Sequence, residues 1–74
     1  MVMITSDILR LIAAGGGIKV NCKNHITSDI VRMAAAAKTG GGILILQDCE
    51  NIITSDKVRI AAAGGGHVIF DLIV

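Results

Sequence analysis

The chain has 74 residues, of which 53% are hydrophobic, and its formal net charge is +1. A balance this close to neutral provides no long-range attraction for nucleic acid, anionic lipid or a strongly charged substrate, so we expect no nucleic-acid partner. No apolar run reaches the roughly 18 to 20 residues that a spanning helix needs, and we expect no membrane span.

The apolar content is higher than a small monomer is able to bury. A chain of this size forms at most one domain and buries only about 60% of its unfolded surface when alone. The sequence contains no proline, no tryptophan and only two cysteines. Association between copies is the remaining way to stabilise such a chain, and we expect a homo-oligomer or a filament.

The amino-terminal sequence gives little information about the compartment. A basic region followed by a long apolar core and a small-residue cleavage site is not evident, so we expect no signal peptide. Two cysteines without such a signal fit a reducing compartment, which favours the cytoplasm but leaves the localisation unassigned.

Three copies of one sequence pattern fill nearly the whole chain. Each copy begins with Ile-Thr-Ser-Asp, continues through an arginine and several alanines, and ends in three glycines. The copies begin at Ile4, Ile26 and Ile53, which divides a single domain, 1–74, into repeats of about 4–25, 26–52 and 53–74. Repetition of this kind indicates stacked units, none of which buries its apolar face alone.

The first half of each repeat has the pattern of a helix. A Thr or Ser hydroxyl is expected to accept a hydrogen bond from a first-turn amide, and the Asp favours the positive end of the helix dipole. Apolar residues then recur at helical spacing. Those expected to pack are Ile8, Leu11 and Ile12 in the first copy, Ile30, Met33, Ala34 and Ala37 in the second, and Val58, Ile60 and Ala61 in the third.

Each helix is expected to end at its glycine triplet, because glycine accepts the left-handed conformation that closes a helix. The triplets are not phosphate loops, since those precede helices rather than follow them. The nine glycines expected to set the turns of the repeats are Gly15, Gly16, Gly17, Gly40, Gly41, Gly42, Gly64, Gly65 and Gly66.

A strand follows each triplet. Residues 18–22 alternate apolar and polar, residues 43–46 are all apolar and predict a strand that needs cover on both faces, and residues 67–74 are the most apolar. Strands separated by helices run parallel with right-handed crossovers. The predicted fold class is α/β: a short parallel α/β solenoid of three helix-strand repeats with one parallel sheet.

A longer pattern surrounds each cysteine. Leu44-Ile45-Leu46-Gln47-Asp48-Cys49 leads to Ile53-Thr54-Ser55-Asp56, and Cys22 leads in the same way to Ile26-Thr27-Ser28-Asp29. This pattern resembles the cysteine-containing leucine-rich repeat, mainly over residues 44–60 and less well over 18–33. The resemblance implies a strand-helix solenoid with a recognition or scaffold role rather than a catalyst.

The cysteines and histidines leave three interpretations open. Cys22 and Cys49 are expected on adjacent strand ends, where buried apolar thiols are favoured. A disulfide between repeats is an alternative in an oxidising setting. A zinc site with His25 and His67 is a third, although only the first Cys-His pair has suitable spacing.

Arginine and aspartate recur together on the predicted helices. Arg10, Arg32 and Arg59 each follow the aspartate of their own copy by three residues. We interpret them as surface ion pairs, with an anion-binding or nucleic-acid-binding ladder as the alternative. No serine has a base at hydrogen-bonding reach in the pattern, so we expect no enzyme and no cofactor.

The ends of the sequence match in register. Within the chain, eight and ten residues separate one glycine triplet from the next Ile-Thr-Ser-Asp. Eleven residues separate them when the end of one molecule is joined to the start of a second molecule. We therefore expect end-to-end assembly, with a closed oligomer that acts as a protein interaction module as the alternative. The near-identity of the copies also fits an engineered consensus repeat. The residues expected at the interface are Ile4, Val68, Phe70, Leu72 and Val74.

Overall fold

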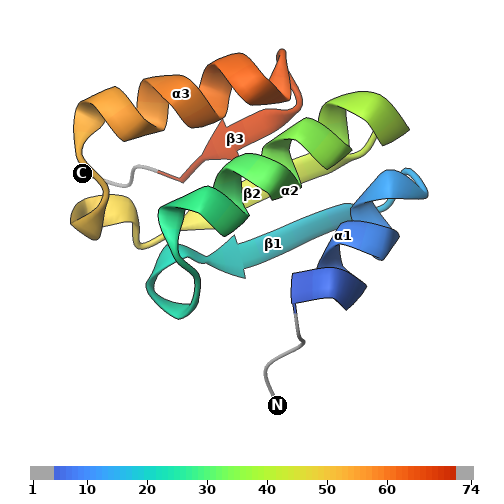
Figure 1. Ribbon diagram of the computed structural model, residues 1–74, viewed down its shortest axis with the longest axis horizontal. Coiled ribbons are helices and arrows are strands. Elements are labelled where there is room, and N and C mark those ends of the chain that lie inside the picture. Colours follow the sequence, from blue (N-terminus) through green and yellow to red (C-terminus); the bar gives the residue numbers. More distant parts are fainter. Residues whose placement is uncertain (1–4, 72–74) are drawn as a thin grey trace.

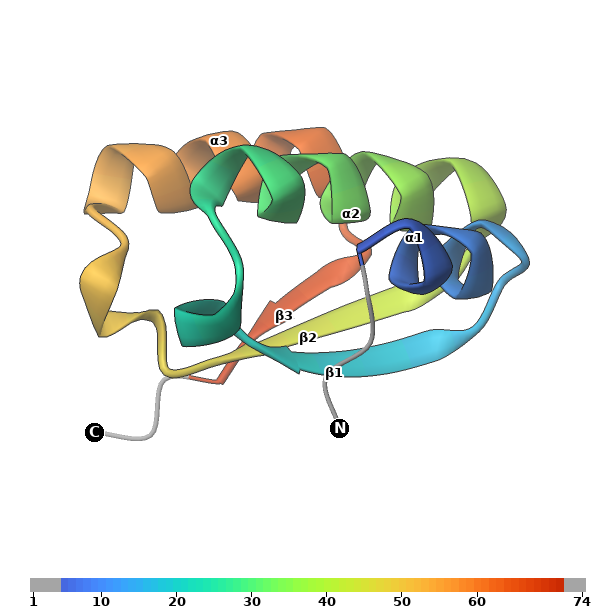
Figure 2. The ribbon, with the colours of Figure 1, turned by 60° about the horizontal axis from the view of Figure 1, so that its bottom comes forward.

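The computed structural model describes residues 5–71, in which three helices alternate with three strands (Figure 1). The elements are α1 (Thr5–Ala13), β1 (Gly17–Asn21), α2 (Thr27–Gly40), β2 (Ile43–Gln47), α3 (Thr54–Gly64) and β3 (Val68–Phe70). A short 3₁₀ turn follows each of the first two strands, at Cys22–Asn24 and Cys49–Asn51. The helices lie side by side over one face of the sheet, which gives a molecule of two layers (Figure 2).

The strands form one parallel sheet in the order β1-β2-β3. Lys19 of β1 pairs with Ile45 of β2, and Ile45 pairs with Ile69 of β3. Parallel neighbours need a crossover connection, and α2 and α3 provide it. The predicted α/β class and the single parallel sheet are confirmed.

The helices begin differently from the prediction. The N-cap residues of α2 and α3 are Ile26 and Ile53, and neither helix has a side-chain cap hydrogen bond within the described chain. The carbonyl oxygen of Ile26 instead accepts hydrogen bonds from the amides of Asp29 and Ile30, at 3.1 and 3.2 Å. Thr27 is already the first helical residue, one position too late for its hydroxyl to act as the cap. The prediction of hydroxyl capping is wrong for these two helices.

The helices end at the glycine triplets, as predicted, but one residue later in two copies. Gly40 still belongs to α2, and the chain leaves the helix at Gly41, whose φ is 78°. Its amide donates a hydrogen bond to the carbonyl oxygen of Ala37, at 2.9 Å. In α3 the same geometry occurs at Gly65, whose φ is 53°. A left-handed glycine with this hydrogen bond closes the helix without the penalty that a side chain would add.

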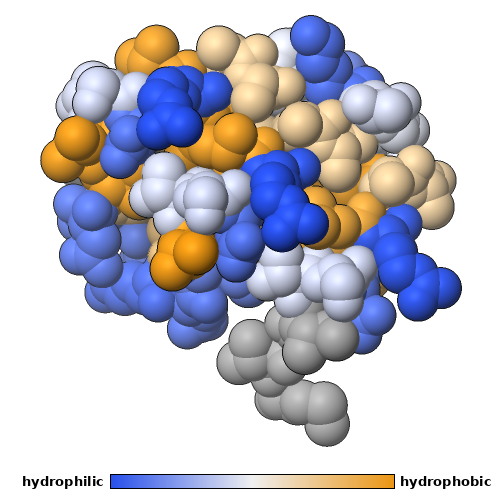
Figure 3. Space-filling model, viewed as in Figure 1, coloured by the Kyte–Doolittle hydropathy of each residue, from blue (hydrophilic) through white to orange (hydrophobic). Residues whose placement is uncertain are grey.

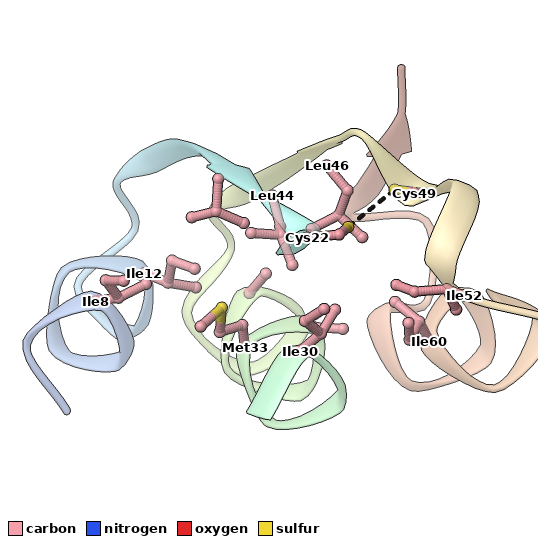
Figure 4. Close-up of a cluster of buried hydrophobic side chains, with 13 residues drawn as sticks. Ile8, Ile12, Cys22, Ile30, Met33, Leu44, Leu46, Cys49, Ile52 and Ile60 are labelled. Atoms are coloured by element: carbon pink, nitrogen blue, oxygen red, sulfur yellow. Dashed lines mark hydrogen bonds between the residues drawn. The ribbon is translucent and has the colours of Figure 1, made fainter. Parts of the chain in front are cut away.

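The core lies between the helix layer and the sheet (Figure 4). Ile30, Met33, Ala34 and Ala37 are all fully buried, which confirms the packing stripe predicted for the second helix. The other buried apolar residues are Ile8, Ile12, Val20, Cys22, Leu44, Leu46, Cys49, Ile52 and Ile60.

The helices cover only one face of the sheet. Leu44 and Leu46 are buried beneath them, whereas Ile43 is 38% exposed and Ile45 is partly exposed on the other face. The sequence predicts that β2 needs cover on both faces. Within residues 5–71 no element covers the second face (Figure 2).

Candidate functional site

One position of the repeat is buried in two helices and exposed in the third. Leu11, Met33 and Ile60 each follow the aspartate of their copy by four residues. Met33 and Ile60 are fully buried, but Leu11 is 48% exposed. In Figure 4, Met33 lies on the side of α2 toward Ile12 of α1, and Ile60 lies on the side of α3 toward Ile30 of α2. This position therefore contacts the preceding helix, and among the described residues no helix precedes α1.

The last helix shows the reciprocal pattern. Ile12, Ala34 and Ala61 occupy equivalent positions, and the first two are fully buried while Ala61 is exposed. Val58 is 61% exposed, although its equivalent Val31 is partly buried against the core. The prediction that Val58 and Ala61 pack is wrong, because no further helix lies beside α3 within residues 5–71.

These positions define two end surfaces. The α1 end consists of Leu11 and the outer edge of β1, and the α3 end consists of Val58, Ala61 and the outer edge of β3. Because β2 lies in the middle of the sheet, each outer strand has one edge with no strand partner among the described residues. Such an edge is a template for another strand. Inside the molecule, the equivalents of Leu11 are buried on the side of their helix toward the preceding helix.

The predicted interface residues of β3 take a different orientation. The side chains of Val68 and Phe70 are partly buried and pack against the core, and Ile69 between them is 50% exposed. The outer backbone edge of β3 has no strand partner among residues 5–71, but its two predicted side chains pack inward. The other predicted interface residues lie outside the described chain: Ile4, Leu72 and Val74.

The predicted turn glycines have a packing role as well. A side chain carbon added to Gly42 would lie 2.5 Å from the carbonyl oxygen of Gly16, and one added to Gly15 would lie 3.4 Å from that of Gly40. The turns of the first two repeats therefore stack backbone against backbone. A side chain in this stack would separate the repeats.

The uncovered face of the sheet carries a small apolar area. Ile43, Ile45 and Ile69 lie on it, next to the exposed Lys19. The next residues on this face are polar: Asn21 pairs with Gln47, and Asp71 follows the end of β3. On the opposite, helix-covered face, hydrophobic surface is interrupted by hydrophilic side chains (Figure 3).

The arginines pair with the aspartates of their own repeats. The nitrogen-oxygen distances are 4.0 Å for Arg10–Asp7, 3.6 Å for Arg32–Asp29 and 3.3 Å for Arg59–Asp56. The predicted spacing of these ion pairs is confirmed. The arginine side chains are 65% to 85% exposed, so each pair adds little stability. Each arginine has a carboxylate beside it, which weakens the case for an anion-binding ladder.

The cysteines meet, but the histidines do not join them. Cys22 Sγ and Cys49 Sγ lie 2.8 Å apart in the core. His67 Nδ1 lies 2.8 Å from the carbonyl oxygen of Gly42, just before β2, whereas Cys49 follows β2. Among the described residues no three His, Cys, Asp or Glu side chains gather as a metal site requires. The four-ligand zinc interpretation therefore has no geometric support.

The pKa of Cys22 is strongly perturbed. Burial and the hydrogen-bonding contact with Cys49 raise it from 9.0 to about 12, and the charge of Lys57 opposes this shift. Lys57 occupies the helix position at which the other two copies have Ile8 and Ile30.

Sequence reasoning missed Leu11, Val58 and Ile69 as candidate surface residues. For Leu11 and Val58, the signal in the sequence is their place in the first and last copies, where the equivalent position of the middle copy has a neighbouring helix on that side. The chain matches no family model, no curated protein and no solved structure. In the part of the chain that the structure describes, no helix has the length and apolar character to cross a membrane.

Proposed function

We propose that this is a non-enzymatic structural repeat protein whose copies stack end to end, so that a parallel α/β solenoid continues from one copy into the next. The observation that carries the proposal is the exposure of Leu11, whose equivalents Met33 and Ile60 are fully buried. A second copy placed as a preceding repeat would cover Leu11 with the side of α3 that carries Val58 and Ala61. The outer edges of β3 and β1 would pair in the same contact.

The energetics favour such a contact. Complete burial of a leucine side chain contributes about 1.5 to 3 kcal/mol, and Leu11 has roughly half of that still to gain. Pairing of two strand edges adds backbone hydrogen bonds along the sheet. A contact between two different surfaces of the same molecule forms a ring when the rotation from one molecule to the next closes, and a filament when it does not. The proposed stack is the filament.

The assembly is tested by light scattering and electron microscopy over a concentration series. The proposal expects particles that lengthen with concentration. Leu11→Glu and Val58→Glu should each abolish growth, because each places a charge in one end surface. Ile26→Glu is the matched control, since Ile26 is 67% exposed in the middle repeat, away from both ends. Growth that survives both end variants would refute the proposal.

A mixing experiment tests the direction of the contact. The Leu11→Glu variant keeps an intact α3 end, and the Val58→Glu variant keeps an intact α1 end. An equimolar mixture should therefore form a heterodimer of fixed size, although each variant alone is monomeric. A symmetric contact, in which the same surface meets itself, would give no heterodimer.

The second candidate is a small interaction module, similar to a leucine-rich repeat, that acts as a closed homo-oligomer. The uncovered sheet face favours it, because Ile43, Ile45 and Ile69 together form an apolar area that a second sheet is able to cover. This candidate expects one fixed oligomer mass at all concentrations, unchanged by Leu11→Glu.

A further inference from the structure

The two cysteines of the chain occupy equivalent places and are in contact. Each is the first residue of a 3₁₀ turn that follows a strand, Cys22 after β1 and Cys49 after β2. Their sulfur atoms lie 2.8 Å apart, and the residues are only 4% and 3% exposed (Figure 4). Both thiols are free. Cys49 Sγ also donates a hydrogen bond to the carbonyl oxygen of Gln47, at 3.7 Å.

An inserted residue brings the two thiols together. The register pairs Asn21 with Gln47, so without an insertion Cys22 would lie beside residue 48 instead of Cys49. Asp48 is the extra residue, and its backbone has a left-handed conformation with a φ of 54°. Only a few per cent of residues other than glycine have a positive φ.

A side-chain hydrogen bond supports this conformation. Asn21 Nδ2 donates to Asp48 Oδ2 at 2.6 Å, and Asn21 Oδ1 accepts from the amide of Lys23 at 2.8 Å. The side-chain amide of Asn21 therefore links Asp48, which precedes Cys49, to Lys23, which follows Cys22. These contacts fix the two strand ends relative to each other at the level of the thiols.

We propose that Cys22 and Cys49 are a redox site that forms a reversible disulfide between the first and second repeats. The sulfur atoms need to approach by less than about 1 Å to reach the bonded separation of about 2.05 Å. Each cysteine lies one or two residues beyond the end of its strand, and these adjacent parallel strands lie about 4.8 Å apart, close to the Cα separation in a disulfide. The inference does not depend on the proposed assembly.

The oxidant is a low-molecular-weight disulfide such as oxidised glutathione. The thiolate of one cysteine attacks a sulfur atom of the oxidant, which forms a mixed disulfide and releases one small thiol. The second cysteine, after losing its proton, attacks the protein sulfur of the mixed disulfide and releases the second small thiol. The protein loses two protons and two electrons, and the small disulfide is reduced to two thiols.

Burial makes this exchange slow but does not prevent it. The thiolate is the attacking species, and the raised pKa of Cys22 keeps that thiol protonated near neutral pH. The first step therefore requires local opening at the ends of β1 and β2. The second step is intramolecular, because the two sulfur atoms are neighbours.

The decisive experiment compares folded and unfolded protein in glutathione redox buffers. The equilibrium constant for the disulfide is measured by quantifying free thiols at a series of glutathione ratios, in buffer and in denaturant. We expect at least a tenfold larger constant for the folded protein, since the fold holds the two thiols together. An equal or smaller constant in the folded state would overturn the proposal.

Peptide mapping identifies the bond. Cleavage after lysine gives one fragment, 20–23, with Cys22 and another, 39–57, with Cys49. These fragments should be linked in the oxidised monomer and separate after reduction. Disulfide-linked dimers in place of this link would also overturn the proposal.

Thermal unfolding provides a second measurement. The bond closes a loop of about 28 residues, and oxidation should raise the midpoint of unfolding by roughly 10 °C or more. The double variant Cys22→Ser, Cys49→Ser is the matched control, and its midpoint should not respond to oxidant. A rise of equal size in this control, or no rise in the oxidised native chain, would contradict a link that stabilises the fold.

Discussion

Gly40 of α2 lies so close to Ala13 of α1 that no side chain fits between them. A carbon added to Gly40 would overlap the carbonyl oxygen of Ala13 and lie 2.7 Å from that of Ile12. Both obstacles are backbone atoms, which are unable to rotate away as the end of a side chain does. The close packing of the first two repeats therefore depends on the absence of a side chain at this position.

Gly40→Ala should lower the free energy of unfolding by about 2 kcal/mol. An alanine is normally favoured over glycine inside a helix by up to about 1 kcal/mol, but here overpacking exceeds that gain. Chemical denaturation measures the change. Gly17→Ala is the control, since its nearest new contact would be 4.0 Å away and its stability should be unchanged or slightly higher. An equally stable Gly40→Ala variant would show that α1 and α2 separate without cost.

Met33→Ala should cost about 2 to 5 kcal/mol, because Met33 is fully buried and its removal leaves a cavity. Leu11→Ala should cost about 1 kcal/mol or less at high dilution, where half of the side chain is already exposed. At concentrations that support assembly, the cost of Leu11→Ala should rise, since the contact with a second copy is lost. Denaturation at two protein concentrations measures both. A concentration-independent cost would contradict the role of Leu11 in assembly.

The reduced protein should lose stability as the pH rises from 9 to 12. The pKa of Cys22 is about 12 in the folded chain and 9.0 in the ordinary, solvated thiol. Above pH 9 the unfolded chain releases this proton while the folded chain keeps it, so the balance shifts toward unfolding. Below pH 9 both states hold the proton and the contribution is constant. Denaturation with a reductant present measures the slope.

Cys22→Ser isolates the contribution of the thiol, because the two proteins differ only at that side chain. The variant should show a shallower loss of stability between pH 9 and pH 12. Identical slopes for the two proteins would mean that the thiol of Cys22 ionises in the folded chain as easily as in the unfolded one.

Arg59→Gln should change the free energy of unfolding by less than about 0.5 kcal/mol. Arg59 forms the shortest of the ion pairs, at 3.3 Å from Asp56, but its side chain is 67% exposed to water. Denaturation at low and high salt measures the effect, which should disappear at high salt. A loss of several kcal/mol would show that the ion pairs, and not the apolar core, hold the helix layer together.

The repeats made much of the fold predictable. Helices, strands and the parallel sheet follow from helical spacing, alternation and the glycine triplets, and the buried stripe of α2 was correct at every position. The corresponding prediction of burial was wrong for Leu11 in α1 and for Val58 and Ala61 in α3. Helical spacing identifies an apolar side of a helix, but burial depends on which neighbours surround that helix.

The candidate sites were less predictable for a similar reason. A strand pattern gives alternation but does not say which face the helices cover, so Phe70 was expected at an interface although it packs inward. The buried, neighbouring places of Cys22 and Cys49 were predicted correctly, but the left-handed Asp48 that accompanies their contact was not. Such features arise from differences between copies, whereas the sequence pattern emphasises what the copies share.

Ile69 and Phe70 should respond in opposite ways to charged substitutions. Ile69 is 50% exposed on the uncovered face, so Ile69→Lys should leave the stability of the isolated chain within about 0.5 kcal/mol of its original value. Phe70→Asp should cost several kcal/mol, because it places a charge against the apolar core. Circular dichroism with chemical denaturation separates these effects from assembly. If Ile69→Lys folds normally but no longer forms a dimer of fixed mass, the sheets meet face to face; if it still forms particles that lengthen with concentration, the contact lies at the ends.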